Sequence, residues 1–372
     1  MQRLRHIHQL GLTYLVFPGA EHSRFSHVLG AMHLAGRAYD AIAAKAGGMM
    51  EIGGRSRARR RVRAAALLHD LGHAPFSHSA EELFEEGIDH EGMTARLLEL
   101  PEIGAIFERH GDGVEPQDVA ALLAGGGEEP AERLLTQILS GELDADKMDY
   151  LLRDSLFCGV RYGSYDLDRL LDTVAPLADP DTGAWGIGVE EGGVHALEAL
   201  VLARYYMFTQ VYFNVTGKAL ELHLAEWLRE RGRGWAADPE AFLEQDDVSV
   251  LSEMRHSPGP HARAVALRSP YPLAFETREH LSAAEKSAFE GLLPEIKARF
   301  GEGSLLISNS AKDPHRLGAS GLLVRRYDGS LERMEEASHF IRHLGRIERF
   351  RVYTPPELRE EVGREIRRRW AD

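Results

Sequence analysis

Histidine residues gather near the start of the chain, and several of them stand beside acidic residues. Nine of the 18 histidines lie within residues 1–90, and the densest group, at residues 69–78, has the order His-Asp-Leu-Gly-His-Ala-Pro-Phe-Ser-His. An apolar helix that ends in adjacent His69 and Asp70 can present an imidazole and a carboxylate to the same cation. Gly72 allows the chain to turn and to direct His73 back toward that cation. This run therefore predicts part of a metal site.

Two protein ligands are too few for a hard divalent cation, so further ligands must come from elsewhere in the chain. His27, in the run Ser-Arg-Phe-Ser-His, is one natural completion, and an acid from residues 143–150 is another. A His-Asp doublet on an otherwise apolar helix has no packing role, because a buried charge is costly unless it is paired or bound to a metal. A metal site is therefore favoured over a satisfied core histidine.

Other candidate residues lack such a context. A lone histidine is most often a solvated residue or a satisfied core residue, so we assign no role to four of them. These four are His6, His8, His22 and His33. The aromatic run at residues 205–213 has a similarly plain interpretation, because aromatic residues at helical spacing usually belong to a core.

The elements that must hold these residues are mainly helical up to about residue 230. Apolar residues recur at spacings of three and four in residues 25–42, 62–68, 131–139 and 196–228, a pattern typical of amphipathic helices. Glycine and proline interrupt this pattern at residues 47–54, 125–130 and 178–193, where helices are expected to end. We expect a hairpin in the last interruption, with residues 185–189 as one strand. Residues 1–230 are thus predicted to form a helical bundle.

Beyond residue 230 the pattern changes. Turn-rich and proline-rich stretches at residues 231–239 and 257–272 precede alternating apolar runs at residues 304–307 and 321–327, which are typical of short strands. Residues 349–353 are expected to form another strand, and residues 358–370, after Pro355, a final charged helix. We therefore expect a mainly α chain in which residues 231–372 form a smaller α+β domain.

The composition limits the class of protein. The chain has 372 residues, of which 44% are hydrophobic and 27% are charged, enough for one large domain and a smaller one. A single cysteine excludes an internal disulfide, and no apolar run approaches the roughly 20 residues that cross a bilayer. We therefore expect a cytoplasmic protein with no membrane partner. The net charge of -14 argues against broad nucleic-acid binding, which depends on lysine and arginine.

Several motifs occur in a fixed order along the first part of the chain. They lie at residues 2–11, 16–20, 24–27, 69–78, 90–91, 144–150 and 153–154. In this combination the chain resembles the HD-domain family and, within it, the deoxynucleoside triphosphate triphosphohydrolases of animals and bacteria. The combination is far more specific than the His-Asp doublet alone, which occurs in many phosphohydrolases. The resemblance implies that residues 1–230 form an HD-domain helical bundle, without the strand and helix that precede it in relatives.

The resemblance implies one divalent cation per active site, either Mg, Mn or Fe. By this resemblance the metal ligands would be His27, His69, Asp70 and Asp146. Four such ligands leave positions for water and for a phosphate oxygen on an octahedral ion.

The resemblance also implies the residues that handle protons. Active-site histidines would be His73, His78 and His90, which would hydrogen-bond the α-phosphate or transfer protons near pH 7. Glu81 would orient His90 as a histidine–carboxylate pair. The implied reaction is attack by water on the α-phosphorus of a dNTP, which releases the deoxynucleoside and inorganic triphosphate.

Substrate-binding residues follow from the same resemblance. The triphosphate would be held by Arg24, Lys147 and Arg204, although each could instead form a surface salt bridge. The sugar would be selected by Gln9, Leu10, Tyr150, Asp154 and Tyr212. A ring packed against C2′ would clash with a ribose hydroxyl, while the alternative for Tyr212 is a place in the core.

Regulation and assembly are expected to follow the relatives. They use a dNTP or GTP activator in some members and are usually dimers or tetramers, so we expect a homo-oligomer. Two rival functions stay open. One is an HD phosphohydrolase acting on a nucleoside monophosphate, a cyclic dinucleotide or another phosphoester. The other is a nucleotide-sensing scaffold without turnover.

Overall fold

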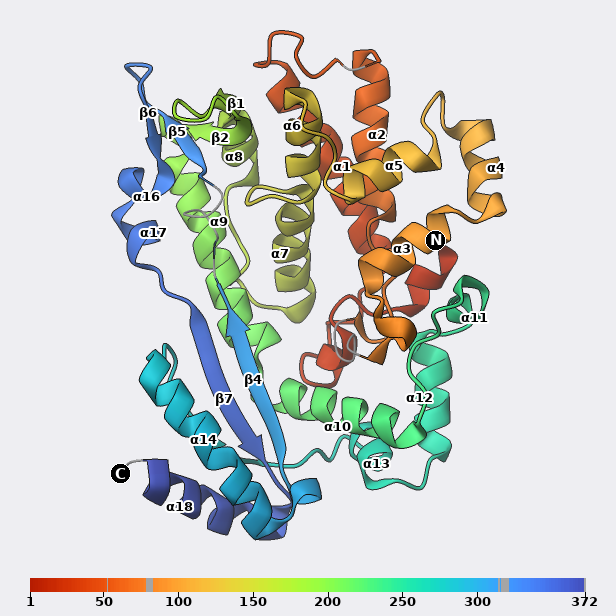
Figure 1. The fold of residues 1–372 in the computed structure, drawn as a ribbon, viewed down its shortest axis with the longest axis vertical. Helices are drawn as coiled ribbons and strands as arrows, with labels where there is room; N and C mark the ends of the chain where they lie inside the picture. Colours follow the sequence, from red (N-terminus) through yellow and green to blue (C-terminus); the bar gives the residue numbers. More distant parts are fainter. Residues whose placement is uncertain (52, 78–82, 314, 316–320, 371–372) are drawn as a thin grey trace.

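The computed structural model describes residues 1–51, 53–77, 83–313, 315 and 321–370, and helices dominate it (Figure 1). The α-helices are α1 (Arg24–Ala43), α2 (Arg55–Leu68), α3 (His90–Leu98), α4 (Pro101–His110), α5 (Pro116–Leu123), α6 (Pro130–Leu139), α7 (Ala145–Cys158), α8 (Leu167–Thr173), α9 (Val194–Met207), α10 (Val215–Arg231), α11 (Pro239–Leu243), α12 (Asp247–His256), α13 (Pro260–Ala266), α14 (Ala283–Phe300), α16 (Met334–Ala337), α17 (His339–His343) and α18 (Arg359–Trp370). Short 3₁₀ helices are η1 (Gln2–His6), η2 (Gly11–Leu15), η4 (Glu85–Gly87), η5 (Glu191–Gly193), η7 (Glu302–Ser304) and η8 (Pro356–Leu358).

The strands form two small sheets. They are β1 (Val174–Ala178), β2 (Trp185–Glu190), β3 (Leu273–Glu276), β4 (Leu306–Lys312), β5 (Leu323–Arg325), β6 (Leu331–Arg333) and β7 (Ile347–Tyr353). One sheet has the order β1-β2-β5-β6 and the other the order β3-β7-β4. Only the pairing of β2 with β5 is parallel among these described strands.

The bundle is centred on α1, which packs against α2 on one side and α7 on another. Glycine permits the second contact. A Cβ atom on Gly30 of α1 would lie 1.8 Å from Asp149 Oδ1 and 2.3 Å from Arg153 Nη2, so only glycine lets α7 bring these two side chains so close. The buried faces of α1, α2, α6, α7, α9 and α10 contribute to one continuous apolar core. This core fixes the helix ends at which the histidine-rich motifs lie.

The C-terminal part has its own small core and also joins the bundle. α14 and α18 pack with β3, β4 and β7 around Phe289, Phe350 and Val352, in the lower part of Figure 1. β5 and β6, by contrast, extend the sheet of β1 and β2. Residues on both sides of the predicted boundary at 230 therefore share a sheet. The observed architecture confirms the predicted mainly α fold with a smaller α+β C-terminal region.

Most predicted elements are present, with two differences. The periodic run at residues 196–228 is not one helix, because the π-helix η6 (Phe208–Tyr212) separates α9 from α10. The strand expected at residues 304–307 is β4, which begins at Leu306 and continues to Lys312. Its later buried positions are Ser308 and Ser310, so the apolar signal stops before the strand does. The hairpin expected at residues 178–193 is confirmed by the antiparallel pairing of β1 and β2.

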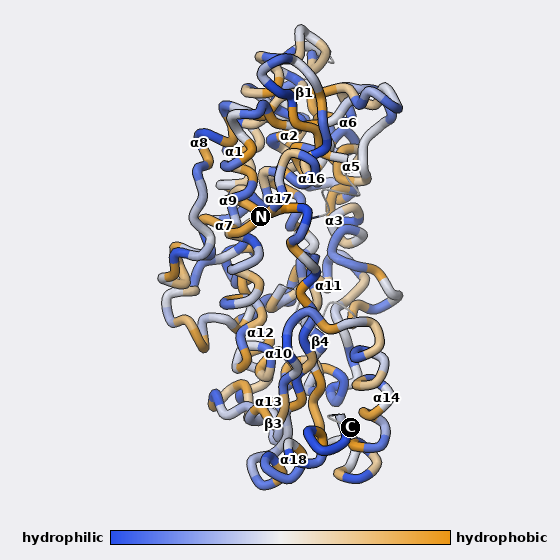
Figure 2. Tube along the Cα trace, turned by 90° about the vertical axis from the view of Figure 1, so that its left-hand side faces the viewer, coloured by the Kyte–Doolittle hydropathy of each residue, from blue (hydrophilic) through white to orange (hydrophobic). Residues whose placement is uncertain are grey.

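The helices carry a mixture of residue types along their length (Figure 2). Within the part of the chain that the structure describes, none of them combines the length and the apolar character that a membrane crossing requires.

Candidate metal centre

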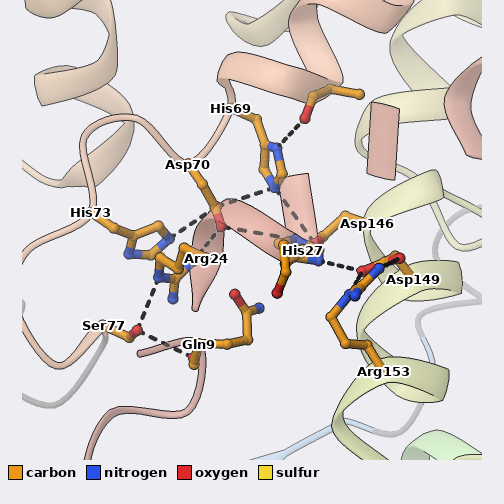
Figure 3. Close-up of polar contacts among 12 residues, drawn as sticks. Gln9, Arg24, His27, His69, Asp70, His73, Ser77, Asp146, Asp149 and Arg153 are labelled. Atoms are coloured by element: carbon orange, nitrogen blue, oxygen red, sulfur yellow. Dashed lines mark hydrogen bonds and ion pairs between the residues drawn. The ribbon is translucent and has the colours of Figure 1, made fainter. Parts of the chain in front are cut away.

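The four predicted ligands meet at one point of the bundle (Figure 3). His27 lies in the first turn of α1, Asp146 lies in the first turn of α7, and His69 and Asp70 directly follow α2. His27 Nε2 lies 2.9 Å from Asp146 Oδ1 and 3.8 Å from Asp70 Oδ2. His69 Nε2 lies 3.1 Å from Asp70 Oδ1 and 3.5 Å from Asp146 Oδ1. Three helices therefore bring two imidazoles and two carboxylates together.

The ligand atoms converge, but the geometry of their contacts leaves hydrogen-bonding capacity unused. Those of His27, His69 and Asp70 all lie within 4.8 Å of one another. Among the residues that the structure describes, the buried Nε2 atoms of both histidines have no hydrogen-bond partner of good geometry, although carboxylate oxygens lie close by. Buried polar atoms normally find a partner, and nitrogen and oxygen donors that converge in this way suit a divalent cation. The residues present therefore fit a metal ion.

The Nδ1 atom of each imidazole is bound by a residue on the side away from the cluster centre. His27 Nδ1 lies 2.8 Å from Asp149 Oδ2, and Arg153 donates two hydrogen bonds, of 2.7 and 2.8 Å, to the same carboxylate. His69 Nδ1 donates to the carbonyl of Ala66 at 2.9 Å. Such contacts place the proton on Nδ1 and leave the lone pair of Nε2 for a metal. The side chains are thus oriented for coordination.

The electrostatics of the cluster favour positive charge at its centre. Burial lowers the pKa of His27, but the carboxylates of Asp146 and Asp149 outweigh it and raise that pKa to about 10. Burial raises the pKa of Asp70, yet Arg24 and His69 hold it well below its usual range. The ionised carboxylates therefore favour positive charge at Nε2 of His27, which a proton supplies when no metal is bound. A divalent cation would supply the positive charge that they favour.

Two of the predicted proton-handling histidines lie beside the cluster. His73 Nε2 lies 3.2 Å from Asp70 Oδ1, and the ring of His73 stacks on that of His90 with centroids 4.2 Å apart. The predicted turn at Gly72 is present, since the His73 N–H donates to the Asp70 carbonyl at 3.2 Å. Gly72 has a second role as well, because a Cβ there would lie 2.3 Å from the carbonyl oxygen of His90. Its missing side chain lets α3 approach. The other two predicted residues, His78 and Glu81, lie outside the described residues.

The three predicted triphosphate-binding cations line one cavity of about 890 Å³ together with three of the four predicted ligands, His69, Asp70 and Asp146. Arg24 donates to the Asp70 carboxylate and, through Nε, to Ser77 Oγ at 2.9 Å. Lys147 Nζ donates to Asp144 at 2.5 Å and to the carbonyl of Gly141 at 2.7 Å. The third cation, the Arg204 guanidinium, lies over the Phe208 ring at 5.7 Å from the ring centroid.

The five predicted sugar-selecting residues line the same cavity. They are Gln9, Leu10, Tyr150, Asp154 and Tyr212. The Tyr212 hydroxyl donates to Asp154 Oδ2 at 2.8 Å, and the Tyr150 and Tyr212 rings meet edge to face at 6.3 Å. Tyr212 belongs to η6, whose π-helical turn interrupts the long helical run. It therefore borders the cavity and also packs against the core.

Sequence reasoning missed several residues of the site. His22, to which we assigned no role, is buried and places Nε2 2.8 Å from Asp154 Oδ1. Asp149 lay in the acidic segment but was not assigned, although its spacing of three from Asp146 and four from Arg153 puts all three on one helix face. Asp247 accepts from the backbone N–H of Phe76 at 2.7 Å. No local sequence signal marks that last contact.

Comparisons with known proteins agree with this geometry. The model of the HD domain matches residues 24–154, and the model of the HD associated region matches residues 166–271. The deoxynucleoside triphosphate triphosphohydrolase SAMHD1 homolog of Dictyostelium discoideum is 30% identical over 390 residues, which covers 95% of this chain and 72% of the relative. The chain therefore belongs to the HD-domain family. Within that family, the cluster of His27, His69, Asp70 and Asp146 fits a divalent metal ion.

Other relatives extend the comparison. The uncharacterized protein YwfO of Bacillus subtilis is 39% identical over 252 residues, 65% of this chain and 53% of that protein. The chain spans about half the length of the first curated relatives that it matches. A solved hypothetical protein from Aquifex aeolicus has a TM-score of 0.81 at 30% identity. The match covers 98% of this chain and 92% of the Aquifex chain. A solved phosphohydrolase from Bacteroides thetaiotaomicron has a TM-score of 0.70 at 26% identity, with 95% and 92% covered.

Proposed function

We propose that the chain hydrolyses deoxynucleoside triphosphates to the deoxynucleoside and inorganic triphosphate. The observation that carries this proposal is one cavity of about 890 Å³ lined by three of the metal ligands, three cationic side chains and the Tyr212–Asp154 pair. Its volume lies within the range of about 300–1,000 Å³ common for small-molecule sites. The Dictyostelium relative, named as a deoxynucleoside triphosphate triphosphohydrolase, matches nearly the whole chain and supports the same substrate class.

The cationic side chains would hold the triphosphate. Arg24 and Arg204 present planar guanidinium groups, which bind phosphate oxygens in pairs, and Lys147 adds a point charge. Arg24 already contacts Asp70 of the cluster, so a phosphate that it binds would lie beside the cluster. This arrangement would place the α-phosphorus next to the His27, His69, Asp70 and Asp146 side chains.

The far wall of the cavity would bind the deoxyribose. Asp154 is buried and is held by two neighbours, the Tyr212 hydroxyl and His22 Nε2, both at 2.8 Å. A carboxylate fixed in this way would accept a hydrogen bond from the 3′-hydroxyl. The Tyr212 ring, packed against C2′, would clash with the 2′-hydroxyl of a ribonucleotide and so favour the deoxy sugar.

The reaction breaks the bond between the α-phosphorus and O5′. A divalent cation held by the four ligands would lower the pKa of the attacking water and neutralise phosphate charge. The water oxygen bonds to the α-phosphorus and loses a proton, while O5′ gains a proton and leaves with the nucleoside. The stacked His73 and His90 would carry that proton, since histidine titrates near neutral pH.

Product analysis in ¹⁸O-labelled water tests this proposal. The metal-replete protein is incubated with each dNTP, singly and as a mixture, and the products are separated by ion-pair chromatography and weighed by mass spectrometry. Attack at the α-phosphorus places the label in triphosphate, whereas attack at the γ-phosphorus places it in free phosphate beside a dNDP. A requirement for the mixture would reveal a nucleotide activator.

The matched variants are His69→Ala/Asp70→Ala, which removes two ligands, and His110→Ala, which changes an exposed histidine outside the cavity. Labelled triphosphate from the wild type and from His110→Ala, but not from the double variant, is the expected result. The same assay is run on nucleoside monophosphates and cyclic dinucleotides, and cleavage restricted to those substrates would instead support the rival phosphohydrolase. No turnover of any nucleotide would support the sensing scaffold.

A further inference from the structure

Asp247 joins the HD-associated region to the loop that follows the His-Asp motif. It is the first residue of α12 and is 1% exposed. Its Oδ1 accepts a hydrogen bond from the backbone N–H of Phe76 at 2.7 Å. Its Oδ2 accepts from the backbone N–H of His8 at 2.8 Å and lies 2.7 Å from His8 Nδ1. One buried carboxylate thus binds two segments that are far apart in the sequence.

The loop that Asp247 binds has an unusual backbone. Phe76 and Ser77 have φ angles of 58° and 60°, in the left-handed region that residues with a Cβ rarely adopt. Such a conformation persists only where its surroundings hold it in place. The hydrogen bond from Phe76 to Asp247 is one such restraint. The hydrogen bond from Ser77 Oγ to the carbonyl of His8, at 2.8 Å, is another.

A second contact ties the same region together. Arg3 donates through Nε to the carbonyl of Gln245 at 2.7 Å and through Nη1 to the carbonyl of His73 at 2.9 Å. The segment just before α12 and the loop after the His-Asp motif are therefore linked twice. Neither link includes a residue of the metal cluster itself.

Two further contacts connect this loop to the metal cluster. Ser77 Oγ accepts from Arg24 Nε at 2.9 Å, and Arg24 Nη1 donates to Asp70 Oδ2; Figure 3 shows this chain from Ser77 to Asp70. We propose that Asp247 is a positioning residue: by holding Phe76 and Ser77 it sets Arg24, and through Arg24 the carboxylate that serves as a metal ligand. This inference rests on the proposed metal-dependent function.

Comparison of two adjacent carboxylates tests the proposal. Asp247→Asn keeps the size of the side chain but removes one acceptor, and Ser77→Ala breaks the middle of the chain. The matched control is Asp246→Ala, because Asp246 caps α12 by accepting from the Ser249 N–H at 2.8 Å and contributes nothing to the Phe76 contact. Binding of Mn²⁺ is measured by electron paramagnetic resonance without nucleotide, and thermal unfolding is measured on the metal-free protein.

We expect Asp247→Asn and Ser77→Ala each to raise the Kd for Mn²⁺ about 10-fold, a typical loss when a partner of a metal ligand is removed. Asp246→Ala is expected to leave the Kd unchanged even where it lowers the unfolding midpoint as much. Equal Kd values for wild type and Asp247→Asn, or an equal rise in Asp246→Ala, would overturn the proposal. If Asp247→Asn does not fold, Ser77→Ala carries the test alone.

The metal measurement also separates this inference from the substrate. A protein that binds Mn²⁺ with the expected pattern but hydrolyses no dNTP would contradict the proposed function and leave the role of Asp247 standing. Where hydrolysis is present, Asp247→Asn should lower kcat/KM about 10-fold, since it would shift Arg24, which contacts the metal ligand Asp70 and faces the proposed triphosphate site.

Discussion

At the scale of single residues, the cluster depends on the hydrogen bond that orients each imidazole through Nδ1. His27 can present Nε2 only because Asp149 fixes Nδ1, and Asp149 is itself fixed by Arg153. Tyr212 and His22 fix Asp154 in the same way on the other wall of the cavity. The site therefore consists of pairs in which one residue would contact the metal or the substrate and a second residue orients the first.

Removal of the charge behind His27 should weaken metal binding. Asp149→Asn replaces the carboxylate that orients Nδ1 with an amide, and we expect the affinity for Mn²⁺ to fall about 10-fold. Titration calorimetry measures the change. The control is Asp168→Asn, an exposed carboxylate paired with Arg37 on the outer surface, which should bind Mn²⁺ like the wild type. Equal affinities in both variants would contradict the role of Asp149.

The choice between deoxyribose and ribose should depend on Tyr212. Tyr212→Ala removes the ring and its hydrogen bond to Asp154, so the preference in kcat/KM for a dNTP over the matching rNTP should fall at least about 10-fold. Tyr205→Ala is the control, because Tyr205 belongs to the same aromatic run but faces Glu279 and His280. An unchanged preference in Tyr212→Ala would show that another residue selects the sugar.

At the scale of elements, a buried histidine pair joins α10 to α13. His223 Nδ1 lies 2.8 Å from His261 Nδ1, and His223 Nε2 accepts from the backbone N–H of Tyr271 at 3.0 Å. His261 Nε2 in turn faces Glu230 Oε1 at 3.7 Å. Burial, helped by the neighbouring His261, lowers the pKa of His223 to about 4. Since Nε2 is an acceptor here, the fold contains the neutral ring.

Stability should therefore fall in mild acid. Below about pH 6.5 the unfolded chain binds a proton that folded His223 excludes until about pH 4, so the free energy of unfolding decreases as the pH falls through that window. The contribution is about 1.4 kcal/mol for each pH unit. His223→Gln should lack it, whereas His195→Gln, at an exposed position, should keep it. Urea unfolding at several pH values measures both slopes, and equal slopes for all three proteins would contradict the assignment.

The elements show where sequence reasoning succeeds and where it stops. Amphipathic spacing predicted α1, α6 and the end of α2, and an apolar helix ending in His69 and Asp70 predicted the cluster, because both signals are local. The π-helix η6 was not predicted, because π-helical turns are rare and the apolar and aromatic residues of the run continue through it. As a result the position of Tyr212, between core and cavity, could not be decided from spacing alone.

At the scale of the whole molecule, contacts between distant segments hold the site and its surroundings. Asp247 lies 171 residues from Phe76, and β5 pairs with β2 across the predicted boundary at residue 230. Neither contact has a local signal, because pairing between distant segments depends on the packed fold. The predicted site residues were found by type and resemblance, whereas these long-range supports needed the structure.

The shared sheet should be needed for stability of the whole chain. Val324 of β5 is 0% exposed and pairs with Val189 of β2, so Val324→Asp would bury a charge and should cost about 3 kcal/mol or more. Tyr327→Ala is the nearby control, because Tyr327 is 83% exposed and its loss should cost about 0.5 kcal/mol or less. Urea unfolding measures both. A loss in Val324→Asp no larger than that in Tyr327→Ala would mean that the two parts unfold independently.

Stepwise metal loading tests the central claim most directly, namely that His27, His69, Asp70 and Asp146 hold one divalent cation on which phosphohydrolysis depends. The protein is stripped with a chelator and returned to Mn²⁺ in steps, while bound metal and dNTP hydrolysis are measured on the same samples. We predict one ion per chain, with activity rising in proportion to occupancy, and loss of both in the Asp70→Ala variant. Full activity in the stripped protein, or wild-type metal binding by Asp70→Ala, would contradict the account.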